Sequence, residues 1–107
     1  MAIHIQQALQ DLAAKAFGPE WRAMRTLLKH WNMIVGEELA RHATPTALKP
    51  VRGPGGETTR LYVRIPGALA PQFKMQEHVM LERINQLLGY GYVSAIVFEH
   101  HIEEKRG

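Results

Sequence analysis

The strongest constraint on the fold is a strand, a helix and a further strand that follow one another in the second half of the chain. In residues 58–65, TTRLYVRI, apolar and polar side chains alternate, as they do in a strand with one buried face. Residues 67–88 instead carry apolar side chains at helical spacing, and residues 93–100, VSAIVFEH, are rich in β-branched and aromatic types. A helical connection allows the two strands to lie parallel, with a right-handed crossover if they are adjacent.

The predicted helix at 67–88 has one buried face and a defined end. Gly89 is well placed for the C′ position, which favours glycine because the backbone there takes a positive φ. The side chains expected on the buried face are Leu69, Phe73, Met80, Ile84, Leu87 and Leu88.

A hairpin is predicted immediately before this unit. Residues 46–52, TALKPVR, form its first strand, and residues 53–56, GPGG, are interpreted as a loop longer than two residues. Pro50 lacks an amide hydrogen, so the first strand should lie at an edge of the sheet or contain a bulge. The glycines match the letter of the G-x-x-G loop that clamps phosphates in KH domains, but that loop joins two helices, so a hairpin tip is the better interpretation.

Helices are predicted before the hairpin. Residues 3–17 are rich in helix formers and are followed by a Gly-Pro pair, which stops a helix. Residues 20–43 form an amphipathic pattern that is either one long helix or two helices broken near His30, and a Thr-Pro pair ends it. The apolar face of this pattern carries Trp21, Met24, Leu27, Leu28, Trp31, Ile34, Val35 and Leu39.

Gly36 lies within this helical pattern, away from its apolar face. Glycine costs about 1 kcal/mol of helix stability relative to alanine, so its presence needs a physical reason. The expected reason is the close approach of another segment or a ligand at this point. Trp31, in contrast, is expected in the core, where truncation to alanine would cost about 3–5 kcal/mol.

These elements give the order α-α-β-β-α-β and an α+β fold. A three-stranded sheet with one apolar face, covered by helices, forms a two-layer sandwich. With 107 residues, 46% of them hydrophobic, the chain can bury one modest core, so residues 1–107 are interpreted as a single domain. Residues 100–107 are polar and are expected to form a frayed end.

Composition and charge narrow the class of protein. The chain has no cysteine, which excludes disulfides and thiolate metal sites and is typical of a cytoplasmic protein. Its start lacks a signal-peptide pattern, and no apolar run approaches the ~18–20 residues of a membrane span, so a soluble protein without membrane contact is expected. Residues 1–66 contain nine Lys and Arg against five Asp and Glu, a balance of +4, whereas residues 67–107 have a balance of −1. A basic first half favours a polyanion such as nucleic acid as partner, although such an excess also serves solubility.

Enzymatic and metal-dependent functions are not favoured. Ser94 is the only serine and lies in a predicted strand, and Asp11 is the only aspartate, so a Ser-His-Asp or Cys-His site lacks its components. The adjacent carboxylates of Glu37 and Glu38 would point about 100° apart on a helix, which does not make an acid–base pair. The six histidines show no H-x-x-x-H spacing. No catalytic residue, metal site or cofactor is therefore predicted.

The predicted strand at 58–65 has a distinctive polar face. The guanidinium groups of Arg60 and Arg64 can pair with phosphates there, while the ring of Tyr62 between them offers a stacking surface for a base. The same pattern is typical of the polar side of a half-exposed sheet, and both interpretations stay open. A basic stripe on the helical pattern at 20–43 is a weaker candidate, because the polar back of an amphipathic helix has this composition by default. The candidate nucleic-acid-binding residues are Arg60, Tyr62, Arg64, Arg52, Arg22, Arg25 and Lys29.

Several motifs in these elements resemble the DciA-like family of bacterial replication proteins. The central motif is W-x-x-I-V-G-x-x-L-A-x-H-x-x-P over residues 31–45. The resemblance continues through LYVR at 61–64, ALAxxF at 68–73 and INxxLG at 84–89, and it spans about residues 20–99. Its structural signature comprises Trp31, Val35, Gly36, Leu39, His42 and Pro45.

The resemblance implies a fold and a function that the residues alone do not give. It implies a KH-like domain that binds single- or double-stranded DNA and the replicative helicase DnaB, and that assists helicase loading when replication starts. On this basis we expect a non-enzymatic replication accessory protein without a cofactor, and self-association stays open. The alternative is a protein-interaction module, or an RNA-binding KH-like domain, with no helicase role.

Overall fold

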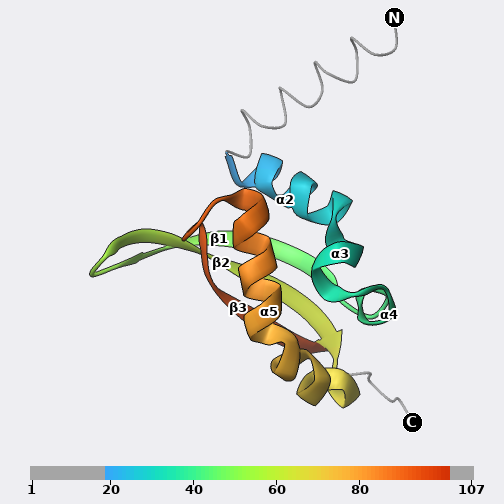
Figure 1. Cartoon of the computed structure of the whole chain (residues 1–107). Helices are drawn as coiled ribbons and strands as arrows, with labels where there is room; N and C mark the ends of the chain where they lie inside the picture. Colours follow the sequence, from blue (N-terminus) through green and yellow to red (C-terminus); the bar gives the residue numbers. More distant parts are fainter. Residues whose placement is uncertain (1–18, 102–107) are drawn as a thin grey trace, which may run out of the picture.

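The computed structural model describes residues 19–101, which form a sheet with helices on one side (Figure 1). The helix expected over residues 3–17 lies outside the described residues, and so do residues 102–107 of the expected frayed end. The described helices are all too short or too polar to span a membrane. In chain order the elements are α2 (Pro19–Lys29), α3 (Trp31–Val35), α4 (Glu37–Ala40), β1 (Thr44–Gly53), β2 (Gly56–Pro66), the 3₁₀ helix η1 (Gly67–Leu69), α5 (Ala70–Leu88) and β3 (Val93–His101).

The three strands form one sheet with β2 at its centre. β1 pairs with β2 antiparallel and β3 pairs with β2 parallel, so α5 lies in the crossover between two adjacent parallel strands. The α+β class, the three-stranded sheet and the parallel pairing are therefore confirmed. β1 is an edge strand, which agrees with the position predicted for the strand that contains Pro50.

The hairpin loop is shorter than predicted. Gly53 pairs with Gly56, which leaves Pro54 and Gly55 as the whole connection. The expectation of a loop longer than two residues was wrong, because Gly56 adopts a φ of 112° and the chain re-enters the sheet directly after the turn. Between this turn and a bulge at Pro45/Ala47 in β1, residues that are equally far from the turn therefore face each other.

The core lies between the sheet and the helices that cover it. Leu61, Val63 and Ile65 on β2 are fully buried, as the alternation predicted. Leu28 and Leu87, both expected on buried faces, are exposed instead. The helices bury narrower stripes than the sequence pattern suggests, so apolar residues at the margins remain in solvent. The buried hydrophobic residues are Leu27, Trp31, Ile34, Val35, Ala43, Leu48, Leu61, Val63, Ile65, Phe73, Met80, Ile84, Val93 and Ile96.

The amphipathic pattern at 20–43 forms three helices rather than one. The break near His30 was one of the two predicted alternatives, and a second break occurs at Gly36. Gly36 has φ 100° and ψ 141°, a conformation that residues with a Cβ rarely adopt. No atom of residues 19–101 lies within 4 Å of the position that a Cβ would take, so none of the described segments makes the close approach expected at this glycine. The backbone conformation that separates α3 from α4 is what requires glycine here.

Trp31 joins the helices to the start of the sheet. Its side chain is buried, and its indole Nε1 donates a hydrogen bond of 3.0 Å to the carbonyl oxygen of Ala43. Ala43 directly precedes β1, whose Pro45 is also buried. Trp31, Val35 and Pro45 of the signature are therefore buried, whereas His42 is exposed in the turn before the strand.

The start of β3 is held by side chains of α5 and β2. The Asn85 side chain donates a hydrogen bond of 2.9 Å to the carbonyl oxygen of Val93 and accepts one of 2.8 Å from its N–H. Burial, followed by the carboxylate of Glu20, raises the pKa of the Tyr92 phenol above its ordinary value of 10.0, while a hydrogen bond with Thr59 lowers it.

β3 extends slightly further than predicted. His100 and His101 pair with Ile65 and Pro66 of β2, so the expectation that the frayed end begins at residue 100 was wrong. Two additional pairs of backbone partners hold these residues in the sheet. At the other end of the connection, Gly89 follows α5 with a φ of 120°, the positive φ predicted for this glycine.

We expect Gly36→Ala to destabilise the fold by about 1–3 kcal/mol, because alanine is strained at this φ. A glycine inside a regular helix would give the opposite sign, since alanine is the better helix former by about 1 kcal/mol. Urea unfolding monitored by circular dichroism measures the change. Gly55→Ala is the matched control, because Gly55 lacks a positive φ and has open space around it. A gain in stability for Gly36→Ala would contradict the role assigned to this residue.

Trp31→Phe keeps most of the buried ring but removes the donor to the Ala43 carbonyl oxygen. The expected loss is about 1–3 kcal/mol of unfolding free energy, because a buried acceptor is left without its partner. Trp31→Ala, which also removes the ring, should lose about 3–5 kcal/mol. The same unfolding experiment measures both variants, and equal stability of Trp31→Phe and the wild type would show that the hydrogen bond contributes nothing.

Candidate nucleic-acid interface

The outer face of the sheet, on the side opposite the described helices, presents the polar residues of β2 (Figure 1). The strand alternation turns Arg60, Tyr62 and Arg64 toward this face, since the residues between them are buried in the core. Both arginines are exposed and Tyr62 is half-buried. The structure therefore brings together the three residues singled out on the polar side of the predicted strand.

Lys49 on β1 completes this group and was missed by the sequence analysis. Its Nζ lies 4.9 Å from the centroid of the Tyr62 ring, within the range of a cation–π interaction. The register also places Lys49 directly opposite Arg60. The loop length was the signal that could have found it, because Lys49 lies four residues before Gly53 and Arg60 lies four residues after Gly56. We name the outer-face cluster by its members Lys49, Arg60, Tyr62 and Arg64.

The cations of the outer-face cluster form no ion pair with any carboxylate among residues 19–101. Glu99 lies opposite Arg64 on β3, but its Oε1 accepts a hydrogen bond of 3.4 Å from the hydroxyl of Thr46 instead. Like charges that face each other across two strands destabilise a sheet. The juxtaposition of Lys49 and Arg60 is therefore an arrangement that a bound anion would stabilise.

The ring of Tyr62 contacts a neighbouring cation and could also stack on a base. The ammonium group of Lys49 already lies over its ring, and the side chain is half-buried. A base could stack on the ring only beside or in place of Lys49. Phosphate groups that contact the exposed cations are the ligand chemistry that this geometry favours.

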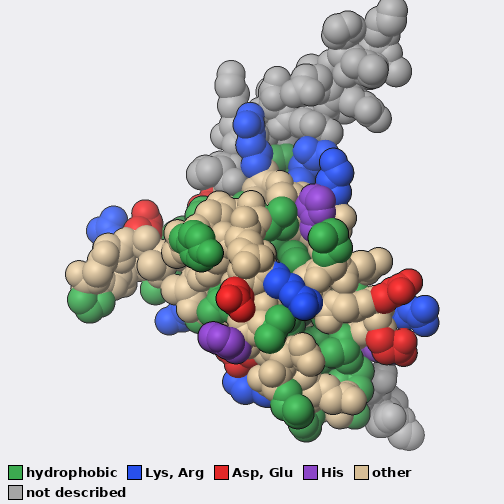
Figure 2. Space-filling view, viewed as in Figure 1, with side chains coloured by type: hydrophobic (Ala, Val, Ile, Leu, Met, Phe, Trp, Pro, Cys, Tyr) green, Lys and Arg blue, Asp and Glu red, His purple; other side chains and the backbone are tan. Residues whose placement is uncertain are grey.

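The other candidate residues lie away from the outer-face cluster. Arg52 is near the hairpin tip, and the alternation from the buried Leu48 places it on the helix side of the sheet. Arg22, Arg25 and Lys29 are exposed on α2. Figure 2 shows basic side chains grouped over α2, well separated from the hairpin. The candidates therefore occupy three separate places, and the cluster on β2 is the one where a second strand adds a further cation.

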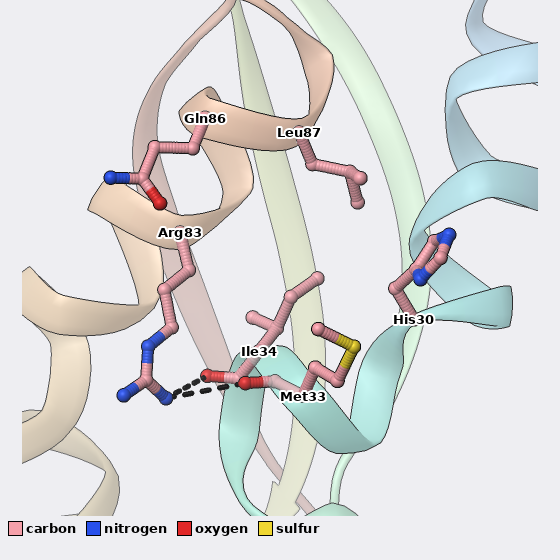
Figure 3. Close-up of a pocket in the computed structure, with 6 residues that line it drawn as sticks. All are labelled: His30, Met33, Ile34, Arg83, Gln86 and Leu87. Atoms are coloured by element: carbon pink, nitrogen blue, oxygen red, sulfur yellow. Dashed lines mark hydrogen bonds between the residues drawn. The ribbon is translucent and has the colours of Figure 1, made fainter.

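A groove of about 510 Å³ lies between α3 and the C-terminal part of α5 (Figure 3). Met33 and Leu87 present apolar side chains to it, and Met33 is 72% exposed. At its rim, Nη1 of Arg83 donates hydrogen bonds to the carbonyl oxygens of Met33 and Ile34, at 3.2 and 3.3 Å. These bonds satisfy carbonyl groups at the end of α3 and tie it to α5. Nη1 of this guanidinium is therefore engaged by backbone carbonyl groups, and Met33, Ile34 and Leu87 give the groove its apolar part.

The described residues do not gather metal-ligating side chains. Within residues 19–101 no three His, Asp or Glu side chains come together in a way that would hold a metal ion. The chemistry that the outer-face cluster offers is thus the binding of anions by fixed cations beside an aromatic ring.

Comparison with known proteins identifies the family. The family described as "Dna[CI] antecedent, DciA" matches residues 4–98 of this chain. The chain belongs to the DciA family. The matched range includes the whole outer-face cluster and all residues of the α3–α5 groove, so both surfaces lie within the family's shared domain.

Curated relatives carry the DciA domain within longer proteins. A UPF0232 protein of Mycobacterium ulcerans (strain Agy99) is 33% identical over 88 residues, which cover 81% of this chain and 43% of the relative. A UPF0232 protein of Mycolicibacterium paratuberculosis (strain ATCC BAA-968 / K-10) is 32% identical over 88 residues, which cover 81% of this chain and 44% of the relative. The chain thus spans less than half the length of these two bacterial relatives. No match was found among solved structures.

Proposed function

We propose that this DciA-family chain is a non-enzymatic accessory protein of DNA replication that acts in the bacterial cytoplasm. In this proposal it binds DNA and the replicative helicase DnaB, and it assists the loading of the helicase. The observation that carries the nucleic-acid part is the outer-face cluster, where Lys49, Arg60 and Arg64 carry charge without a described carboxylate partner. Membership of the DciA family supports the helicase part.

The spacing of the cations fits an extended polyanion. Arg60 and Arg64 are four residues apart on one strand, which corresponds to roughly 13 Å along β2. Successive phosphates of one DNA strand rise by about 3.4 Å along a duplex axis, so the two arginines span several phosphates rather than one. A compact anion such as a single phosphate ion would contact only one end of the cluster.

Such contacts supply affinity without reading sequence. Cations that pair with phosphates position a protein on nucleic acid, whereas base edges carry the sequence information. The half-buried ring of Tyr62 adds at most a stacking contact, which every base tolerates. Binding without sequence preference suits a protein that assists a helicase on single strands of any sequence.

We expect the logarithm of the affinity for a single-stranded DNA oligonucleotide to fall linearly with the logarithm of the salt concentration. Arg60→Ala and Arg64→Ala should each reduce the magnitude of this slope by about 0.7, because each variant loses one phosphate contact. Fluorescence anisotropy of a labelled oligonucleotide at several salt concentrations measures the slope.

Arg52→Ala is the matched control for this titration, because it removes an arginine from the other side of the sheet and should leave the slope unchanged. An RNA oligonucleotide of the same sequence tests the RNA-binding alternative, which a clear preference for RNA would favour. Absence of DNA binding at low salt, or full binding by the variant that lacks both Arg60 and Arg64, would show that the outer face is not the binding surface.

A second candidate function is a protein-interaction module that docks an apolar segment of a partner protein and makes no use of nucleic acid. The α3–α5 groove favours it, because a largely exposed methionine in an apolar groove is typical of surfaces that bind protein segments. In this case the basic residues of the outer face would serve solubility alone.

A titration of purified replicative helicase with this chain, with and without single-stranded DNA, separates the two functions. Met33→Glu should weaken helicase binding, because a charge in the groove opposes an apolar ligand. Met75→Glu, on α5 outside the groove and at a residue that is 80% exposed, is the matched control and should bind normally. Helicase binding by a variant without DNA affinity would favour the interaction module, and binding to neither partner would exclude both functions.

A further inference from the structure

β3 is an edge strand with a free side. Within the described part of the chain it pairs with β2 alone, so one side of its backbone has no strand beside it. The unpaired N–H and C=O groups of an exposed edge form a template for pairing with another strand. Proteins usually protect such edges with proline, charged side chains or bulges.

β1, the opposite edge, has all three protections. Pro45 and Pro50 cannot donate a backbone hydrogen bond. Lys49 and Arg52 place charge on the strand, and a bulge interrupts its register between Pro45 and Ala47. An added strand would therefore meet missing donors, charge and irregular backbone along β1.

β3 leaves its edge open. Val93–His101 contains no proline, lysine or arginine. Its carboxylate, on Glu99, is drawn across the sheet and away from the free edge, because it accepts a hydrogen bond from Thr46 on β1. Its bulge, at Ser94, is also tied inward, since the Ser94 hydroxyl donates a hydrogen bond of 3.1 Å to Thr58 on β2. The rest of β3 is a regular edge with mainly apolar side chains.

A hollow lies along the middle and later part of this edge. The hollow, of about 590 Å³, is lined by the start of α5, including Pro71 and Lys74, and by Ile96, Val97, Phe98 and His100 of β3. Because α5 returns antiparallel to β3, as Figure 1 shows, the start of α5 and the end of β3 are at the same end of the molecule.

We propose that β3 pairs antiparallel with β3 of a second copy of this chain, about a two-fold axis at Val97. Val97 is the midpoint of Val93–His101, so this register gives every residue of the strand a partner. It places Glu99 opposite Ala95 of the other copy, so the carboxylates do not face each other. The hollow, which Val97 itself helps to line, then lies beside the axis, next to the second copy of β3.

The pairing produces one continuous sheet with the strand order β1-β2-β3-β3-β2-β1. The outer-face clusters of the two copies then lie on the same side of that sheet. A nucleic acid that crosses the sheet meets both clusters, so the dimer extends the proposed binding face. The pairing itself rests on the β3 edge and does not depend on the proposed function.

Sedimentation velocity of the full chain over a wide range of concentrations tests the proposal. The wild type should form a dimer that dissociates on dilution. Val97→Lys places two ammonium groups opposite each other at the axis and should sediment as a monomer. Val51→Lys makes the same substitution at a half-buried residue on β1, the other edge, and should remain dimeric. Circular dichroism establishes that each variant is folded.

Single-cysteine variants test the register, because the chain has no cysteine of its own. Directly opposed Cβ atoms of antiparallel strands lie about 4.5–5.5 Å apart, close to the separation that a disulfide bridges. Val97→Cys should therefore form a disulfide-linked dimer on mild oxidation, and Val51→Cys should not.

A wild-type chain that stays monomeric at the concentrations used for NMR would overturn the proposal. A dimer that Val97→Lys leaves intact, or equal cross-linking of Val97→Cys and Val51→Cys, would overturn it as well. DNA affinity of each variant at a concentration where the wild type is a monomer is measured separately, so failure of the dimer is distinguishable from failure of the proposed function.

Discussion

Leu61, Val63 and Ile65 are buried in the core, and a strand can bury these three side chains only by turning the alternate ones outward. A slip of one residue in the register of β2 would bury Arg60 and Arg64 and expose the apolar residues. The desolvation of two unpaired guanidiniums forbids that slip. The burial that stabilises the core therefore also determines which face carries the cations, so the candidate binding surface is a direct consequence of the packing.

The sequence predicts best those helices and strands in which hydrophobic residues recur at a regular, uninterrupted spacing. The alternation in β2, the apolar stripe of α5 and the β-branched residues of β3 were sufficient to identify these elements, their order and the parallel pairing. Each of them has one buried face, so the hydrophobic pattern carries the information directly. The Arg-Tyr-Arg side of the candidate site followed from the same alternation.

The features that sequence analysis missed depend on backbone geometry or on packing between elements. The sequence analysis explained Gly36 by the close approach of another segment or a ligand. The structure instead shows a positive φ at Gly36, which depends on the path of the chain from α3 to α4. The sequence analysis did not identify Lys49 as a binding residue, because it predicted too long a hairpin loop. The loop length determines which residue of β1 faces Arg60. Leu28 and Leu87 are apolar yet exposed, because the width of the buried stripe depends on what each helix packs against.

In the proposed function, the two faces of the molecule have separate tasks. The outer face of the sheet offers cations to a polyanion, while the helix side offers an apolar groove to a protein segment. In the proposed dimer, the edge of β3 joins these surfaces to those of a second copy. The outer face and the α3–α5 groove lie on opposite sides of the sheet, so occupation of one leaves the other accessible.

NMR titration of the isotope-labelled chain with a short single-stranded DNA tests the central claim most directly. We predict that the largest chemical-shift changes occur in β1 and β2 around Lys49, Arg60, Tyr62 and Arg64, with small changes in α5. Changes confined to α2 around Arg22, Arg25 and Lys29, or to the α3–α5 groove, would contradict the assignment of the outer face as the nucleic-acid interface.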